Sequence, residues 1–284
     1  MGGDAIVCAA APLETPVKLA TLTAAISCAL SLCAGPAMAN DWPGGARAAV
    51  VLTYDDAMPS QLETAIPALD AHGLKATFFL SNLRQADLPR WRAVAGEGHE
   101  LANHTLFHAC TAATFEADPR YVTEAYTIGS LLREIEQANV LLTAIDGRDR
   151  HGFATPCGQS TAGGLDYLEA LRTSGLVTYV RGVSVEDADL GAEVAAVDRM
   201  RIPAKAFDAD VTGAELIDWV RKAVDGGGLT VLLFHGVGGE HLPVSAEAHA
   251  ELLDWLAAHR DLVWTTTLQD ALDHAAPETA APSR

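Results

Sequence analysis

Apolar runs rich in β-branched and aromatic residues alternate along this chain with stretches of helical periodicity, and that alternation constrains the fold most strongly. Parallel strands need a crossover of a dozen or more residues between them, which is where the helical stretches fall. The predicted strands are residues 48–53, 75–80, 100–103, 152–155, 176–180, 229–234 and 262–266, and the predicted helices are 60–71, 119–145, 213–224 and 246–258. About seven such units in 284 residues predict an α/β fold, a closed or nearly closed barrel in a single domain.

The net charge of the chain limits the kinds of molecule that it can bind. The chain carries 37 acidic and 19 basic residues, a formal net charge of −18. So acidic a surface disfavours nucleic acid and anionic membranes as partners, because both are polyanionic. It does not argue against a neutral polysaccharide.

The first 39 residues are typical of an export signal. Lys18 precedes an apolar run over residues 19–34, and the small-x-small sequence of residues 37–39 follows as a cleavage site. The run is shorter than the ~20 apolar residues that cross a bilayer. We therefore expect a signal peptide over residues 1–39, a mature catalytic domain over 40–284, a periplasmic or secreted location, and no membrane contact beyond the signal.

Two of the five cysteines, Cys110 and Cys157, remain in the expected mature domain. In an exported protein they are compatible with one disulfide, and equally with two independent buried thiols. Composition and spacing leave these alternatives open.

Polar residues follow several predicted strands at the point where each strand ends. In parallel β/α barrels the carboxyl ends of the strands carry the active site. Asp55 and Asp56 follow the first strand, His104 follows the third, and His235 follows the strand over residues 229–234. One such residue alone is more often a turn or capping residue, but the set has the chemical types that a metal-dependent hydrolase uses.

His104 and His108 carry the strongest local signal. Their four-residue spacing predicts that both imidazoles lie on one side of a helical turn, within reach of one ion. No Glu follows His104, so the zinc-protease pattern is disfavoured. Asp55 and Asp56 are expected to point in different directions, one toward a cation and one toward the reacting water. Glycines after His235 give a ligand close access to the backbone, and this imidazole is a candidate general acid.

Together these segments resemble the polysaccharide deacetylases, the NodB-homology group also called carbohydrate esterase family 4. The family's first motif, Thr-Phe-Asp-Asp-Gly, is similar to residues 53–57, Thr-Tyr-Asp-Asp-Ala. Its second, His-(Ser/Thr)-x-x-His, matches residues 104–108, and its last, a strand end of the type Leu-x-x-His, matches residues 232–235. The resemblance covers roughly residues 47–270, with the motifs in the family's order and spacing.

The resemblance implies a distorted (β/α) barrel with about seven strands and a divalent metal, most often Zn²⁺. By position it makes Asp56, His104 and His108 the metal ligands, Asp55 the general base and His235 the general acid. Three protein ligands leave positions for a water and for the substrate carbonyl. The acid role requires an imidazolium, so a carboxylate near His235 is expected to raise its pKa.

Three departures from the family pattern bear on the site. Ala57 replaces the Gly of the first motif, a small change if the backbone there keeps φ negative. Ala154 stands where the third motif usually carries an Arg that orients the base, so the sequence leaves the partner of Asp55 unidentified. The fourth motif, an Asp-Trp pair after a strand, has no convincing match, since Asp218-Trp219 lies in a helical stretch. The group that tunes His235 is unidentified as well.

Two further expectations concern the surroundings of the site. Cys110 follows the second motif and Cys157 lies in the third, so a disulfide between them would brace the ligand loops. Ser245 is expected to cap the helix over residues 246–258.

We therefore expect an exported, metal-dependent hydrolase that removes N- or O-linked acetyl groups from a carbohydrate polymer or oligosaccharide. One alternative is a hydrolase of a small non-sugar amide on the same scaffold, which the export signal disfavours. Another is a non-catalytic carbohydrate-binding relative, which the complete set of ligands, base and acid disfavours. The sequence does not specify the acetylated substrate, the native metal or the oligomeric state.

Overall fold

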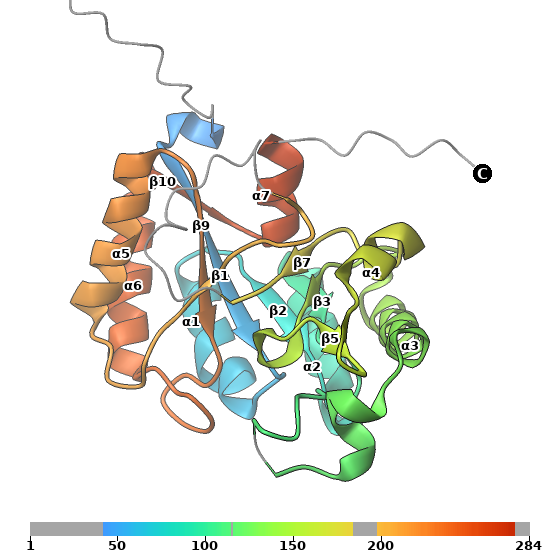
Figure 1. Cartoon of the computed structure of the whole chain (residues 1–284). Helices are drawn as coiled ribbons and strands as arrows, with labels where there is room; N and C mark the ends of the chain where they lie inside the picture. The colour runs from blue at the N-terminus through green and yellow to red at the C-terminus, as the bar shows by residue number, and fades with distance from the viewer. Residues whose placement is uncertain (1–41, 115, 184–197, 276–284) are drawn as a thin grey trace, which may run out of the picture. The chain divides into compact units, whose positions relative to one another are not determined.

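A curled sheet of parallel strands forms the centre of the fold (Figure 1). The computed structural model describes residues 42–114, 116–183 and 198–275. Its main sheet has the order β7-β4-β3-β2-β1-β9-β8, and β10 also pairs with β1. These strands are β1 (Ala48–Asp55), β2 (Thr77–Leu80), β3 (Glu100–Asn103), β4 (Phe153–Ala154), β7 (Val180–Arg181), β8 (Lys205–Ala206), β9 (Leu229–Phe234) and β10 (Val263–Thr266).

The two edges of this sheet approach each other. Ile202, which lies just before β8, forms a parallel bridge with Arg181 of β7. Because β8 pairs with β9, this bridge nearly closes the sheet on itself. The predicted single-domain α/β fold, a distorted barrel with about seven strands, is confirmed.

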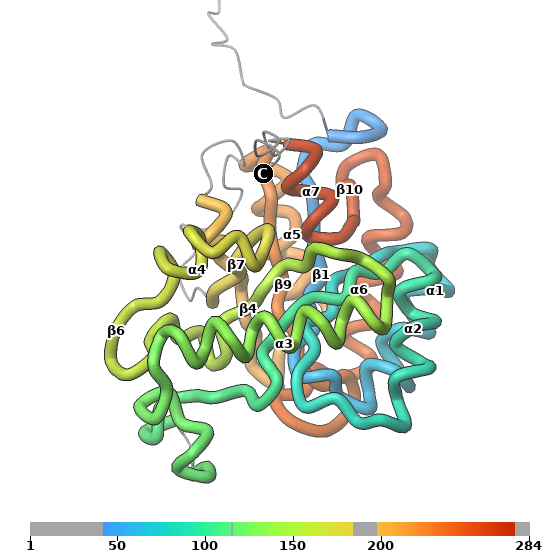
Figure 2. Tube along the Cα trace, turned by 90° about the vertical axis from the view of Figure 1, so that its right-hand side faces the viewer, coloured from blue at the N-terminus to red at the C-terminus, as the bar shows by residue number. Residues whose placement is uncertain are grey.

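Helices cover the outside of the sheet, except the last one, which packs against residues that face its interior. The helices are α1 (Ile66–Ala71), α2 (Leu88–Gly96), α3 (Ile128–Asp146), α4 (Leu168–Ser174), α5 (Gly213–Gly226), α6 (Ala246–Ala258) and α7 (Leu268–Ala275). In Figure 1, α5 and α6 lie side by side next to β9 and β1. On another side, α2 and α3, both labelled in Figure 2, pack together, and both also contact β3. A small hairpin, β5 (Thr161–Ala162) and β6 (Leu165–Asp166), lies apart from the main sheet.

Strand periodicity decides which residues face the interior. Alternate residues of β1, Ala49 and Val51, belong to the inner cluster, whereas Val50, Leu52 and Tyr54 belong to the outer cluster under the helices. Thr53 and Asp55 continue the inner series toward the carboxyl end. The inner cluster contains several small alanines, which leaves space for polar side chains; its buried members are Trp42, Ala46, Ala49, Val51, Phe79, Ala102, Ala154, Tyr179, Ile202, Ala204, Leu229, Val231, Leu233, Leu268, Ala271 and Leu272.

Three of the predicted elements have the boundaries that the structure shows. The predictions 100–103, 229–234 and 246–258 coincide with β3, β9 and α6. The helix predicted over 119–145 begins only at Ile128, because Thr127 and Ser130 form a capping box there, and two short 3₁₀ turns, Pro119–Tyr121 and Thr123–Ala125, precede it.

The helix predicted over 60–71 has two parts. Gln61–Ala65 is a π-helical turn, labelled η2, and α1 follows it. Pro67 lacks the N–H that a regular α-helix needs at that position, which accounts for the wider turn before it. The structure also adds three short strands and three helices that the sequence patterns did not predict, β5, β6, β8, α2, α4 and α7.

All residues that the structure describes fall within one compact unit. The signal peptide predicted over residues 1–39 lies outside the described residues. In the described part of the chain, no helix combines the length and the apolar character that a membrane span requires.

Candidate active site

The five predicted site residues meet at the carboxyl ends of β1, β3 and β9. Asp55 is the last residue of β1, His104 directly follows β3, and His235 directly follows β9. Asp56 lies in the middle of the group. Its Oδ1 is 3.5 Å from Nε2 of His104 and 3.2 Å from Nε2 of His108, and its Oδ2 is 3.9 Å from Nε2 of His235. The structure therefore brings together residues that are up to 180 positions apart in the sequence.

Asp56, His104 and His108 fit a metal ion. One ligand atom from each lies within 4.8 Å of the others. Oδ1 of Asp56 is buried and has no hydrogen-bond partner within the described ranges, although two imidazole nitrogens approach it. A cation between these three atoms would satisfy the oxygen that is otherwise unpaired.

Each of the two imidazoles contacts another group through Nδ1, and its Nε2 faces Asp56. Nδ1 of His104 donates to the carbonyl oxygen of Ala154 at 2.9 Å, which leaves the lone pair on Nε2. Nδ1 of His108 lies 3.7 Å from Sγ of Cys110, a distance at which an N–H donates weakly to sulfur. Burial lowers the pKa of His104 to about 4, so its imidazole is neutral at physiological pH, as a metal ligand must be.

The segment from His104 to His108 is an irregular loop, so the predicted helical turn is wrong. Thr105 and His108 have left-handed φ values of 63° and 52°. The Thr105 N–H donates to the side chain of Asn103, and the His108 N–H donates to Oγ1 of Thr105. These local hydrogen bonds, and not helical geometry, turn both imidazoles toward Asp56.

Glu134 of α3 supports the same loop from outside. One of its carboxylate oxygens accepts hydrogen bonds of 3.0 Å from the backbone N–H groups of Leu106 and Phe107. The other accepts from the Tyr126 hydroxyl at 2.6 Å. Sequence spacing gives no signal for this contact, because α3 begins 20 residues after His108.

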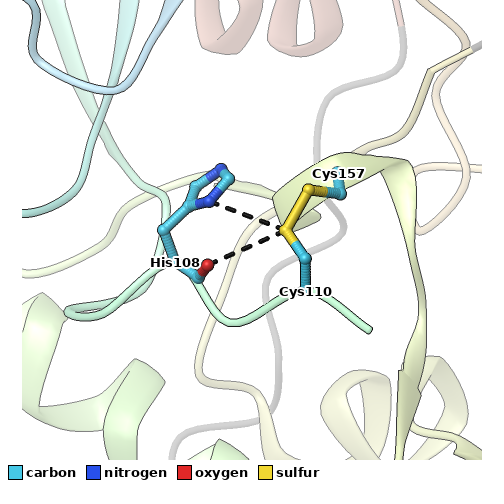
Figure 3. Close-up of side chains that lie close together, drawn as sticks. All are labelled: His108, Cys110 and Cys157. Atoms are coloured by element: carbon cyan, nitrogen blue, oxygen red, sulfur yellow. Dashed lines mark hydrogen bonds between the residues drawn. A yellow bond between two sulfur atoms is a disulfide. The ribbon is translucent and has the colours of Figure 1, made fainter. Parts of the chain in front are cut away.

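Cys110 and Cys157 form a disulfide (Figure 3), which decides between the two alternatives that the sequence left open. The bond joins the loop that carries His108 to the turn that follows β4. In Figure 3 the Cys110 sulfur faces both the imidazole and the carbonyl oxygen of His108. His108, Cys110 and Cys157 also lie close enough together to hold one ion, but the disulfide occupies both sulfurs.

Arg181 of β7 is the partner of Asp55 that the sequence left unidentified. Its guanidinium is fully buried, and Nη2 donates to both carboxylate oxygens of Asp55 at 2.5 Å. Ala154 and Arg181 are registered partners in β4 and β7, so their side chains point to the same face of the sheet. The small side chain of Ala154 leaves the interior open for the longer one from the next strand. A charged residue at the end of an apolar run was the signal that identified Asp55 and His235, and it would have identified Arg181 as well.

These neighbours set the charge states of Asp55 and His235. Burial alone would raise the pKa of Asp55, but the positive charge of Arg181, with His104 and His235, brings that pKa below its ordinary value. Burial lowers the pKa of His235, and Asp55 and Asp56 oppose this without reversing it. The expected carboxylates are therefore present, but the expected net rise in the pKa of His235 is wrong because desolvation is the larger effect.

The turn after β1 has an unusual backbone. Asp56 and Ala57 have φ values of 77° and 54°, both in the left-handed region. The condition under which alanine would be a small change at this position, a negative φ, is therefore not met, and the Ala57 methyl group is strained there.

Two minor predictions have clear outcomes. Asp218-Trp219 lies within α5, where Trp219 is buried and donates to Thr230, so this pair is not a strand-end motif. Ser245 is the N-cap of α6, and its hydroxyl accepts from the backbone N–H of Ala248.

The fold and the site define a β/α-barrel protein with an acid–histidine cluster at the carboxyl ends of its strands. Residues 44–175 match the family described as polysaccharide deacetylase. Over this segment, the resemblance inferred from the motifs is confirmed.

Solved structures and a curated relative are similar to parts of the chain. A Mycobacterium smegmatis protein assigned as a polysaccharide deacetylase superposes with a TM-score of 0.57 at 19% identity, over 86% of this chain and 95% of that one. The catalytic domain of a peptidoglycan N-acetylglucosamine deacetylase from Eubacterium rectale gives 0.52 at 20% identity, over 79% and 90%. A gellan lyase from a Bacillus species is 27% identical over 117 residues, which are 41% of this chain and 4% of that protein.

Proposed function

We propose that this protein is an exported, metal-dependent deacetylase that hydrolyses N- or O-linked acetyl groups of a carbohydrate. The observation that carries the proposal is that the two adjacent carboxylates have different surroundings. Arg181 engages both oxygens of Asp55, whereas Oδ1 of Asp56 lies unpaired between two Nε2 atoms. One carboxylate is thus arranged for proton transfer and the other for a cation.

Asp56, His104 and His108 would hold the cation, for which Zn²⁺ fits the nitrogen and oxygen donor set. When bound, the cation would activate a water and polarise the acyl carbonyl. A neutral His104 and a tautomer fixed by the Ala154 carbonyl support this assignment.

Asp55 accepts the proton of the attacking water. Arg181 holds the carboxylate in place and keeps it ionised despite burial, so the base is ready at neutral pH. His235, on the other side of Asp56, donates a proton to the departing nitrogen or oxygen as the tetrahedral intermediate collapses. Its lowered pKa makes the imidazolium a stronger proton donor and reduces its population at neutral pH.

Arg181 also bears on the alternative of a non-catalytic carbohydrate-binding relative. The absence of the third-motif arginine at Ala154 would favour that alternative, but the Arg181 side chain from β7 supplies an equivalent charge. The alternative of a small non-sugar amide as substrate uses the same chemistry, so only the substrate distinguishes it.

Acetate release from chitooligosaccharides, peptidoglycan and acetylxylan, measured with and without a chelator, tests the proposal. We expect release from at least one saccharide, loss of release on chelation, and recovery when Zn²⁺ is restored. A protein that binds saccharide but releases no acetate, with or without added metal, would contradict the proposal. Release only from small amides would contradict its substrate class.

A further inference from the structure

Gln61, in the first turn after β1, connects the backbones of the proposed base and acid. Its side chain is completely buried. Nε2 donates to the carbonyl oxygen of Asp55 at 2.5 Å and to the carbonyl oxygen of His235 at 3.1 Å. A primary amide has two N–H groups, and here each one is directed at one of the two residues proposed to transfer protons.

This contact lies where the sheet stops holding the two residues together. The pairing of β1 with β9 ends where Tyr54 lies opposite Phe234, one residue before Asp55 and His235. Beyond that pair, the Gln61 amide bridges the two segments that continue from β1 and β9. Its orientation is fixed by chemistry, because two carbonyl oxygens accept from an NH₂ group and repel the amide oxygen.

The neighbouring Ser60 strengthens the same junction. Its hydroxyl donates to the Glu240 carboxylate at 2.8 Å and accepts from the Val237 N–H at 3.1 Å. Both partners lie in the loop after β9. The turn that begins at Ser60 is therefore tied to the His235 loop by two consecutive side chains, while the π-helical turn η2 directs Gln61 inward.

The other end of the amide argues against a purely stabilising role. Oε1 of Gln61 is buried and has no hydrogen-bond partner among the residues that the structure describes. An unpaired buried carbonyl is unfavourable for folding, so a side chain retained for stability alone gains nothing from it.

We propose that Gln61 is a positioning residue that fixes the spacing between Asp55 and His235. This rests on the proposed function, in which one residue accepts a proton and the other donates one within the same turnover. Loss of the bridge frees the His235 loop relative to β1, so the imidazole no longer meets the leaving group at the correct distance. Displacements of about 1 Å at such sites lower rates by up to about 10²-fold.

Gln61→Met tests this, because methionine has a similar length and lacks the N–H groups. The matched control is Gln269→Met in α7, whose amide is also hydrogen-bonded, to Thr178 and Asp273, but lies away from the site. We expect Gln61→Met to lower kcat for an acetylated oligosaccharide at least about tenfold, with KM and metal content unchanged. Gln269→Met should leave kcat unchanged.

The leaving group separates positioning from general damage. The nitrophenolate of 4-nitrophenyl acetate departs without a proton from His235, so kcat for this ester should fall much less in Gln61→Met than kcat for the saccharide. Equal losses for both substrates, or a kcat within twofold of wild type for the saccharide, would overturn the proposal. If Gln61→Met does not fold, Gln61→Leu also lacks both donors, adds no charge and carries the same expectations.

A readout without activity keeps this test separate from the proposed function. Crystal structures of the wild type and the variant report the separation of the Asp55 and His235 carbonyl oxygens. We expect this separation to widen in the variant, and an unchanged separation would overturn the positioning role. A wild-type protein that deacetylates no saccharide would instead count against the proposed function.

Discussion

Arg181 shows how one residue decides the state of the proposed base. Asp55 is buried, and burial alone would raise the pKa of its carboxyl group. The guanidinium from β7 reverses this, and Ala154 leaves room for it. The charge that the family pattern places on one strand is thus supplied here by the next strand.

Replacing Arg181 with Met should raise the pKa of Asp55, because the charge is lost and burial remains. The acidic limb of the pH profile of kcat/KM is then expected to move to higher pH, with a loss of about 10²-fold at neutral pH. Arg181→Lys keeps the charge without the planar fork and should move the limb less. An acidic limb that stays in place in Arg181→Met would show that Arg181 does not control Asp55.

Ala57 carries backbone strain that glycine relieves. Because its φ is 54°, Ala57→Gly should stabilise the protein by about 1 kcal/mol, measured by denaturant unfolding. The matched change Ala144→Gly, at an exposed position in α3, should instead cost about 1 kcal/mol. Destabilisation by both changes would mean that the left-handed conformation at residue 57 is not strained.

At the scale of elements, strands were predictable and the loops that carry the ligands were not. Apolar runs predicted β3 and β9, because strands of a parallel sheet are buried on both faces and therefore lack a polar face. The conformation of residues 104–108 depends on Glu134 and on the disulfide, which lie far away in the sequence. The positions of His104 and His108 were therefore predictable, but the helical turn assigned to them was not correct. A search for charged residues at the ends of apolar runs would have identified Arg181 as well, although the predicted strand ended one residue before it.

The disulfide between Cys110 and Cys157 should stabilise both the fold and the ligand loop. It closes a loop over a sequence separation of 47 residues, and replacing both cysteines with Ala should cost about 2–4 kcal/mol. Because Cys110 contacts His108, we also expect weaker Zn²⁺ binding in a competition titration with a chromogenic chelator. Oxidised wild-type protein is the reference, because reduction would release two thiols beside His108 that bind Zn²⁺ themselves. Unchanged Zn²⁺ affinity in the variant would remove the disulfide from the support of the ligand loop.

At the scale of the whole domain, the barrel has a polar network at its amino end, away from the site. Glu100 at the start of β3 is buried and accepts hydrogen bonds from Thr77, from Tyr179 and from the backbone N–H of Gln269. These groups come from β2, the segment before β7, and α7. Burial raises the pKa of Glu100 above its ordinary value despite these donors.

This raised pKa predicts a loss of stability with rising pH. The folded state keeps the proton of Glu100 at pH values where the unfolded chain has released it. The contribution is therefore fully present below about pH 4.5 and is lost as the pH rises through the folded-state pKa. Glu100→Gln retains the shape, accepts from Thr77 and can donate to Tyr179, so the difference in unfolding free energy between the variant and wild type should grow in favour of the variant over this range. A difference that does not change with pH would contradict the raised pKa.

The assignment of different roles to Asp55 and Asp56 is the central claim, and one paired measurement tests it directly. Zinc content and acetate release are measured for Asp55→Asn and Asp56→Asn beside the wild type. We expect Asp55→Asn to retain stoichiometric zinc and lose acetate release, and Asp56→Asn to lose zinc as well. Full turnover in Asp55→Asn, or undiminished zinc binding in Asp56→Asn, would contradict the claim.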